Sequence, residues 1–355
     1  YISYLIEIDK YKEAKDITEN LSYLSTPLLI SQGKKWIESE QLIEFKNIFS
    51  CKNPDDIISE FLFLVGNLYS SKDNYKQSNF YLNMSYFLNP KFKFNLSLLA
   101  ENHFFNKDYV NTEKVLENFN NKNEFYYWFK LKKEAQIISK KISDEKALDF
   151  INLKFKKIKD PSTRMILDIA NFNRNLKKYK IAIQYYDQII SLIEIDSEYY
   201  SEILYRRGGS YERLGDYEKS DKDLLKSLEI NPNDAYVLNY LAYSWLERDY
   251  KIDDALKMLE RAYAEESDDP YIIDSIGWAY YLIEDFTAAE NYLKRAVELM
   301  PQDPTVNDHY GDILWKLDRK IQARYFWKSV LNLSETDDEM KKEIEKKLII
   351  GLKNS

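Results

Sequence analysis

Small and large apolar residues recur at a fixed spacing in the second half of the chain. Between Leu204 and Trp327 a glycine or alanine returns about every 34 residues, and a large apolar residue follows it three positions later. These pairs are Gly208 and Tyr211, Ala242 and Trp245, Gly277 and Tyr280, and Gly311 and Leu314. Residues three or four positions apart share one face of an α-helix, so each pair predicts a helix with an apolar face.

A second small residue then recurs downstream, with a large apolar residue four positions after it. These pairs are Ser220 and Leu224, Ala255 and Leu259, Ala289 and Leu293, and Ala323 and Trp327. The pattern predicts a second helix in every repeat. Self-similarity at this period is typical of a solenoid, in which each helix pair buries its apolar face against its neighbours.

Glycine supports the same repeat frame. Four of the eight glycines, Gly66, Gly208, Gly277 and Gly311, fall at the same place in their predicted helices. Glycine inside a helix costs about 1 kcal/mol relative to alanine. We therefore expect the partner helix to cross closest at these positions, where a larger side chain would hold the two backbones apart.

The first half of the chain follows the frame more loosely. Matching residues are Ile169, Ala170, Ala182 and Tyr186; Trp128, Ala135 and Ala147; Leu99, Ala100, Leu116 and Phe119; and Gly66, Tyr69, Ser78 and Leu82. Residues 26–50 predict a divergent hairpin around Trp36 and Phe45. Pro90, Pro232 and Pro301 are expected to follow second helices, and Pro270 and Pro304 to begin first helices.

The two ends complete the predicted organisation. Tyr11 and Ala14 indicate the second helix of a pair whose first helix has barely begun, so we expect a segment upstream of Tyr1. Residues 338–355 predict a capping helix with Met340, Ile344, Leu348 and Ile349 on its apolar side. The expected parts are divergent repeats at 1–160, well-matched repeats at 161–337 and the cap.

Composition narrows the classes of function. The chain is 45% apolar and 31% charged, which suits a folded protein, and no apolar run approaches the roughly 18 residues of a membrane span. The net charge of -8 is uneven, because residues 161–355 carry 27 basic against 37 acidic residues. An acidic half disfavours DNA or RNA as a partner.

The residues that usually carry chemistry are scarce. Cys51 is the only cysteine, and His103 and His309 are the only histidines. The stretch from Gly208 to Ser210 lies in a predicted helix and lacks the lysine of a phosphate-binding loop. We therefore expect no catalytic residues, no metal and no cofactor, and interpret the chain as a non-enzyme.

Residues 270–301, PYIIDSIGWAYYLIEDFTAAENYLKRAVELMP, resemble the tetratricopeptide repeat (TPR). The resemblance implies an all-α, right-handed superhelical solenoid of stacked antiparallel helix pairs. It also implies that the first helix of each pair lines a concave groove that binds a peptide or a partner protein.

Carried onto this chain, the resemblance assigns the groove to residues that flank the small residue of each first helix. They are Arg164, Asp168, Asn171, Arg174, Tyr205, Arg206, Arg213, Asn239, Tyr240, Tyr243, Asp274, Ser275, Trp278, Tyr281, Asp308, His309 and Asp312. Such a groove would run from basic through aromatic to acidic. Tyr243 and Trp278 fit the groove and the core equally well, and His309 fits either a groove residue or a local hydrogen-bonding residue.

Residues 237–330 resemble a bacterial group of long TPR proteins, through LNYLAYSWLERDYKIDDALKMLERA, DDPYIIDSIGWAYY and PTVNDHYGDILWKLDRKIQARYFWKSVL. Members of that group are commonly exported, often as cell-envelope lipoproteins, and some are adaptors that bring a periplasmic protease to its substrates. The resemblance implies a protein partner, with an envelope protease as one candidate. It also implies a periplasmic or outer-membrane location, to which the cytoplasm is the alternative.

Three interpretations of function stay open. The first is a non-catalytic adaptor or scaffold that binds a peptide in the groove. The second is the targeting region of an enzyme whose catalytic domain lies upstream of Tyr1. The third is a self-assembling protein whose groove receives another copy of the chain.

Overall fold

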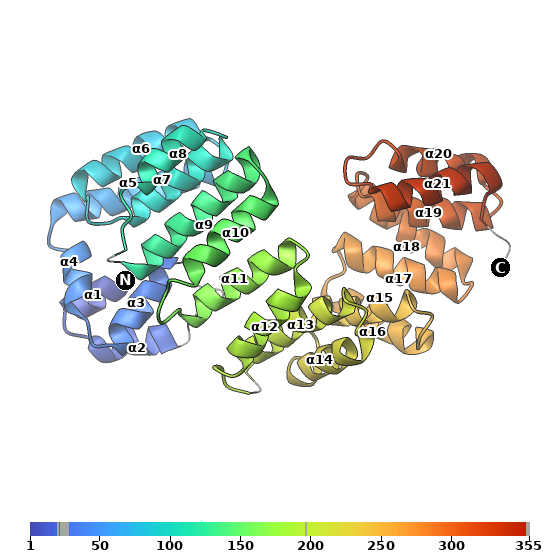
Figure 1. Cartoon of the computed structure of the whole chain (residues 1–355), viewed down its shortest axis with the longest axis horizontal. Helices are drawn as coiled ribbons and strands as arrows, with labels where there is room; N and C mark the ends of the chain where they lie inside the picture. The colour runs from blue at the N-terminus through green and yellow to red at the C-terminus, as the bar shows by residue number, and fades with distance from the viewer. Residues whose placement is uncertain (20, 22–27, 122, 196, 353–355) are drawn as a thin grey trace. The chain divides into compact units, whose positions relative to one another are not determined.

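The computed structural model describes residues 1–19, 21, 28–121, 123–195 and 197–352, and these residues form 21 helices and no strand (Figure 1). The fold is an all-α helical solenoid built from successive helix pairs. It divides into two compact units, Tyr1–Ile189 (unit 1) and Ile190–Ser355 (unit 2). The predicted division at residue 160 concerns how well the repeats match, and it stays a prediction.

Unit 1 contains six successive helix pairs in its described residues. They are α1 (Ile2–Glu7) with α2 (Tyr11–Glu19), α3 (Leu28–Glu38) with α4 (Ile43–Ile48), α5 (Pro54–Ser70) with α6 (Tyr75–Leu88), α7 (Phe94–Phe105) with α8 (Tyr109–Leu116), α9 (Glu124–Lys141) with α10 (Asp144–Phe155), and α11 (Thr163–Asn175) with α12 (Tyr179–Ile190). The divergent hairpin corresponds to α3 and α4, where Trp36 and Phe45 pack edge to face. Its residues 26 and 27 lie outside the described residues.

Unit 2 contains four further pairs and a final helix. They are α13 (Glu198–Glu212) with α14 (Tyr217–Ile230), α15 (Ala235–Leu246) with α16 (Ile252–Glu265), α17 (Pro270–Leu282) with α18 (Phe286–Leu299), α19 (Pro304–Lys316) with α20 (Lys320–Val330), and α21 (Asp338–Ile350). Pro270 and Pro304 occupy the first turns of α17 and α19, as predicted. Pro232 and Pro301 follow the ends of α14 and α18, also as predicted.

Short polar side chains begin the helices of unit 2. Asp216, Asp234, Asp269, Asp285 and Asp303 each accept hydrogen bonds from backbone N–H groups in the first turn of the helix that follows. These N–H groups have no partner within the helix, so each cap stabilises the helix start by about 1 kcal/mol.

The predicted close crossing of paired helices is confirmed at all four glycines. A Cβ atom at Gly66 or at Gly208 would lie 3.0 Å from Leu82 or Leu224, the large residue sixteen positions later. The same spacing joins Gly277 to Leu293 and Gly311 to Trp327. All four large side chains are fully buried: Leu82, Leu224, Leu293 and Trp327. The second helix therefore seats one large side chain against the bare backbone of the first.

The first helices of unit 2 also meet one another. Helix α15 contacts α13 on one side and α17 on the other, and α17 contacts α19. The second helices α14, α16 and α18 each pack between the first helix of their own pair and that of the next. The first helices therefore share one face of the unit, which we call the inner face.

The capping helix α21 closes the last pair. Ile344 is fully buried, and Met340 and Leu348 pack against the core formed by α17 to α20. Ile349 is 78% exposed, so its predicted place on the apolar side is wrong. The helix ends directly after Ile350, and Gly351 turns the chain with a φ of 72°. None of the described helices is long and apolar enough to cross a membrane.

We predict that Gly277→Leu lowers the free energy of unfolding by about 1–3 kcal/mol, because it overpacks the crossing of α17 and α18. A Cβ atom at Gly277 would lie 2.7 Å from Leu293 Cγ and 3.1 Å from the Leu293 backbone nitrogen. Urea unfolding followed by circular dichroism measures the change.

The matched control is Ala264→Leu, which adds the same side chain at an exposed position of α16. We expect it to change the free energy of unfolding by no more than about 0.5 kcal/mol. Equal stability of the two variants would contradict the close crossing.

Candidate functional site

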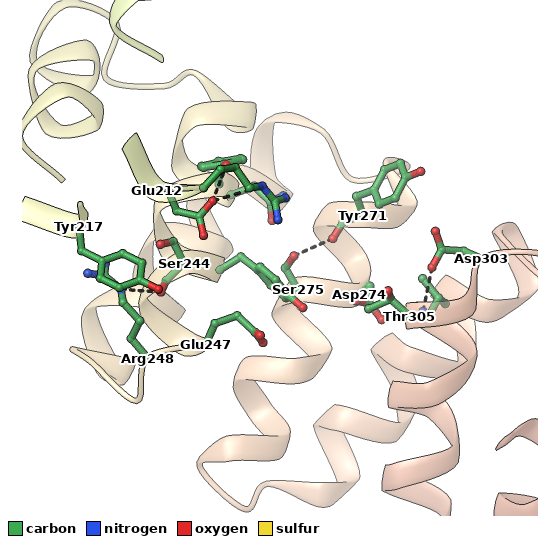
Figure 2. A pocket seen from close by; sticks show the side chains of 15 residues that line it. Glu212, Tyr217, Ser244, Glu247, Arg248, Tyr271, Asp274, Ser275, Asp303 and Thr305 are labelled. Atoms are coloured by element: carbon green, nitrogen blue, oxygen red, sulfur yellow. Dashed lines mark hydrogen bonds and ion pairs between the residues drawn. The ribbon is translucent and has the colours of Figure 1, made fainter. Parts of the chain in front are cut away.

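A cavity of about 460 Å³ opens on the inner face of unit 2 (Figure 2). The end of α13, the start of α14, helices α15 and α17 and the start of α19 form its walls. Its lining residues are Glu212, Arg213, Tyr217, Asn239, Tyr240, Tyr243, Ser244, Glu247, Arg248, Tyr271, Asp274, Ser275, Asp303, Thr305 and Val306.

The structure brings six of the predicted groove residues into this one cavity: Arg213, Asn239, Tyr240, Tyr243, Asp274 and Ser275. Asn239 and Asp274 occupy the same helical position, three residues before Ala242 and Gly277. Tyr271 and Thr305 were not predicted, although they lie six residues before Gly277 and Gly311, one helical turn earlier on the same face. Extending the repeat rule by one turn would have found both.

Three polar atoms in the cavity wall have no hydrogen-bond partner in the described residues. They are Asn239 Oδ1, Ser244 Oγ and Asp274 Oδ1. Ser244 and Asp274 are only 7% and 5% exposed. A buried polar atom without a partner costs about 1–3 kcal/mol, so such atoms mark a place where a ligand or water completes the site.

Both arginines of the cavity are held by acidic residues. Arg248 contacts Asp221 at 2.8 Å and lies 4.5 Å from the centre of the Tyr217 ring. Arg213 Nε lies 3.4 Å from a carboxylate oxygen of Glu212. Neither guanidinium therefore presents an unopposed positive charge to a ligand.

Tyr240 and Tyr243 form the aromatic part of the wall. Tyr240 donates to Glu212 at 3.0 Å, and its phenol lies over Gly209, where a Cβ atom would be 3.2 Å from the Tyr240 oxygen. Burial raises the pKa of both tyrosines. The negative charge of Glu212 raises the pKa of Tyr240 further, and that of Glu247 does the same for Tyr243. Both phenols are therefore neutral hydrogen-bonding groups at physiological pH.

A stack of rings borders the cavity behind Asp274. The His309 ring lies 4.1 Å from Trp278, and Trp278 lies 4.6 Å from Tyr281 on its other face. His309 is buried and its Nδ1 lies 2.8 Å from Asp274 Oδ2, so of the two alternatives it is the local hydrogen-bonding residue. Tyr243 is half-buried and lines the cavity, whereas Trp278 is half-buried within the stack.

The histidine carries a shifted pKa. Burial disfavours the charged ring, but the hydrogen-bonded carboxylate of Asp274, with Asp308 and Asp312 nearby, raises the pKa of His309 above its ordinary value. The pair joins α17 to α19 on the inner face.

The predicted acidic end of the groove is neutralised by the capping helix. Lys347 of α21 donates to Asp308 at 2.7 Å and to both carboxylate oxygens of Asp312 at 2.8 Å. Trp327 also donates to Asp312, at 2.9 Å. Burial and the neighbouring Asp308 raise the pKa of Asp312, whereas Lys347 opposes that rise. The two acidic residues are thus at the predicted end of the groove, but a lysine of the cap pairs with both of them.

The remaining predicted groove residues lie outside the cavity wall. Tyr205 packs edge to face on Tyr240, and Arg206 pairs with Glu202 at 2.7 Å. In unit 1, Asp168 accepts hydrogen bonds from Trp128 and Lys132 at 2.8 Å each. Three further residues of the set belong to α11. Arg164 lies 3.6 Å from Asp168, the side chain of Asn171 accepts a hydrogen bond from the Tyr186 hydroxyl, and Arg174 is half-buried. Whether any of these contacts a partner stays a prediction.

The described residues hold no group of three or more histidine, cysteine or acidic side chains that could bind a metal ion.

Comparisons with known proteins agree with the repeat frame. The tetratricopeptide repeat model matches residues 201–234 and 272–303. These two segments of the chain are tetratricopeptide repeats. A TPR repeat-containing protein of Pseudomonas aeruginosa is 33% identical over 110 residues, which are 31% of this chain and 18% of the relative. The chain thus spans about a fifth of the length of this curated relative.

Three solved structures share helical folds with half of the chain. MamA of Desulfovibrio magneticus covers 50% of the chain and 97% of its own length, at 22% identity and a TM-score of 0.41. A thermophilic TPR protein of Thermus thermophilus covers 53% and 100%, at 17% identity and 0.45. PilF of Pseudomonas aeruginosa covers 53% and 88%, at 12% identity and 0.44.

We predict that His309→Asn removes a pH-dependent part of the stability. A raised pKa in the folded state stabilises the fold below the unfolded pKa of about 6.5, and this contribution is lost as pH rises through the folded pKa. The difference in unfolding free energy between wild type and variant should therefore shrink as the pH rises above about 6.5 and through the folded pKa of His309. Asp274→Asn should show the same trend. A difference that stays constant with pH would contradict the assignment.

We also predict that Lys347→Met lowers the unfolding free energy by about 2–4 kcal/mol, because it leaves Asp308 and Asp312 together without a cation. Lys346→Met, on the exposed side of the same helix, is the control and should have little effect. Urea unfolding monitored by tryptophan fluorescence measures both, and equal stability of the two variants would contradict this role of Lys347.

Proposed function

We propose that the chain is a non-catalytic adaptor that binds a peptide segment of a partner protein on the inner face of unit 2. The observation that carries the proposal is the cavity in which Asn239, Ser244 and Asp274 each present a buried polar atom without a partner. A ligand that supplies hydrogen-bond donors would satisfy these atoms.

The chemistry of the wall suits a peptide. Tyr240, Tyr243 and Tyr271 offer rigid rings, which give contact area at little cost in conformational entropy. Polar side chains alternate with these rings along α15 and α17, as a backbone with regularly spaced N–H and C=O groups requires. Interfaces that bury aromatic residues among satisfied polar groups are typical of specific protein recognition.

The arrangement of polar residues supports a role without catalysis. The His309 ring is buried behind Asp274 and stacked on Trp278, so it cannot reach a substrate in the cavity. The Ser275 hydroxyl donates to the Tyr271 carbonyl oxygen at 2.8 Å. The histidine therefore acts through packing and hydrogen bonding.

The finer proposal concerns the partner and its compartment. The resemblance of residues 237–330 to exported TPR lipoproteins motivates a partner in the cell envelope, such as a protease or an assembly factor. Capture from an envelope extract of the source bacterium tests it, with the Tyr243→Ala variant as comparison.

We predict that Tyr243→Ala weakens peptide binding at least about tenfold, because the ring forms the centre of the cavity wall. Dodecapeptides that bind the full chain are first selected by phage display. Their affinities for wild type and variant are then measured by fluorescence polarisation. Circular dichroism establishes that the variant is folded.

The control is Tyr325→Ala, which removes a tyrosine that is 72% exposed on the second helix α20. It should bind the selected peptides like wild type. Equal binding by both variants would move the binding site away from the cavity, and a failure to select any peptide would count against peptide recognition. Light scattering over a concentration series would show whether another copy of the chain is the occupant.

A further inference from the structure

The unpartnered polar atoms of unit 2 concentrate in one place. Five such side-chain atoms occur in its described residues, and three of them, on Asn239, Ser244 and Asp274, line the cavity. An amide oxygen, a hydroxyl oxygen and a carboxylate oxygen share the ability to accept a hydrogen bond. A ligand that brings several donors would therefore satisfy these three atoms.

Negatively charged side chains outnumber positively charged ones in the cavity wall, which also favours a ligand that donates hydrogen bonds. Four carboxylates and two guanidinium groups line the cavity, and both arginines are already held, Arg213 by Glu212 and Arg248 by Asp221. Glu247 and Asp303 have no ion-pair partner in the part of the chain that the structure describes. An anionic ligand would meet this surplus of negative charge, whereas a cation would be attracted by it.

Asp274 is the central carboxylate of the site. Its Oδ2 atom is occupied by His309 at 2.8 Å, and its Oδ1 atom is buried in the cavity wall without a partner. The side chain is 7% exposed, so a donor that approaches it displaces little solvent and forms a strong hydrogen bond. His309 fixes the direction in which the second oxygen points.

The aromatic wall adds a second attraction for a cation. Tyr243 and Tyr271 both line the cavity, and Glu247 lies one helical turn after Tyr243 in the sequence. The face of an aromatic ring attracts an ammonium or guanidinium group, and the ring also packs against the methylene groups that carry it.

We propose, on the basis of the proposed peptide-binding function, that this cavity binds the cationic side chain of a lysine or arginine in the partner segment. The alkylammonium or guanidinium group donates to Asn239 and Asp274, its methylene groups pack on Tyr243, and Glu247 attracts it at the mouth of the cavity. The site thus selects segments with a basic residue at one fixed place.

Small cations test the pocket without a peptide. n-Butylguanidinium and n-butylammonium are titrated into the full chain, with n-butanol and n-butyrate as neutral and anionic controls of the same length. Two-dimensional amide NMR should show saturable shifts confined to α15, α17 and the start of α19, for the cations only. Glu247→Gln should weaken the binding about threefold or more, and Glu265→Gln, at an exposed position of α16, should not. Equal shifts from n-butanol, or none from either cation, would overturn the proposal.

Peptides separate this proposal from the function on which it rests. In the peptides selected by display, the conserved basic residue is replaced by norleucine, which keeps the length and removes the charge. We expect about a tenfold loss of affinity or more for wild type, and a much smaller loss for the Asp274→Asn, Glu247→Gln variant.

Two further outcomes are informative. Peptides that need Tyr243 but tolerate norleucine within about twofold would overturn the cationic pocket and leave the adaptor function standing. Binding of the small cations without any peptide binding would support the pocket and overturn the peptide-binding function.

Discussion

The structure depends on one recurring contact, the seating of a large apolar side chain of the second helix against a glycine or alanine of the first. Gly277 and Leu293 show it most closely among the leucine pairs, and Gly311 with Trp327 shows that the same crossing accommodates an indole. Because the contact fixes the rotation of each first helix, it also decides which side chains reach the inner face. The residues of α15 and α17 that line the cavity are positioned relative to that small residue.

A second regularity follows from the first. Each first helix contacts the next first helix through a fixed pair of positions. One is the residue three positions before the small residue of the earlier helix, and the other is the residue two positions before the small residue of the later helix. Asp274 meets His309 in this way, Tyr205 meets Tyr240, and in unit 1 Lys132 meets Asp168. The same pair of positions is filled by an ion pair, two aromatic rings or a hydrogen-bonded histidine, so the backbone geometry tolerates varied chemistry there. In unit 2 the first helices are therefore joined by interhelical contacts, and the cavity opens beside those made by α15 and α17.

Features that repeat along the chain could be predicted from the sequence, whereas features that occur only once could not. The helix pairs and the close crossing at Gly208 follow from spacing, and the resemblance to the TPR assigned Asn239 and Asp274 to one groove. The neutralisation of Asp312 could not be predicted, because its partner Lys347 belongs to the cap, which has no counterpart in the other repeats. Ile349 was misplaced for a related reason, since a terminal helix packs on one side only. Glu247 and Arg248 were missed because they lie beyond the end of α15, where helical periodicity no longer fixes direction.

Asp312 ties the end of the solenoid to the repeat before it. The carboxylate accepts hydrogen bonds from Trp327 within its own helix pair and from Lys347 of α21. If α21 alone detached, a buried carboxylate would lose its cation beside a second acidic residue, Asp308. Fraying of the terminal helix is thereby penalised, and α19, α20 and α21 are expected to open as a single cooperative unit. The amide protons of α19, α20 and α21 should therefore exchange as slowly as those of the preceding helix pairs.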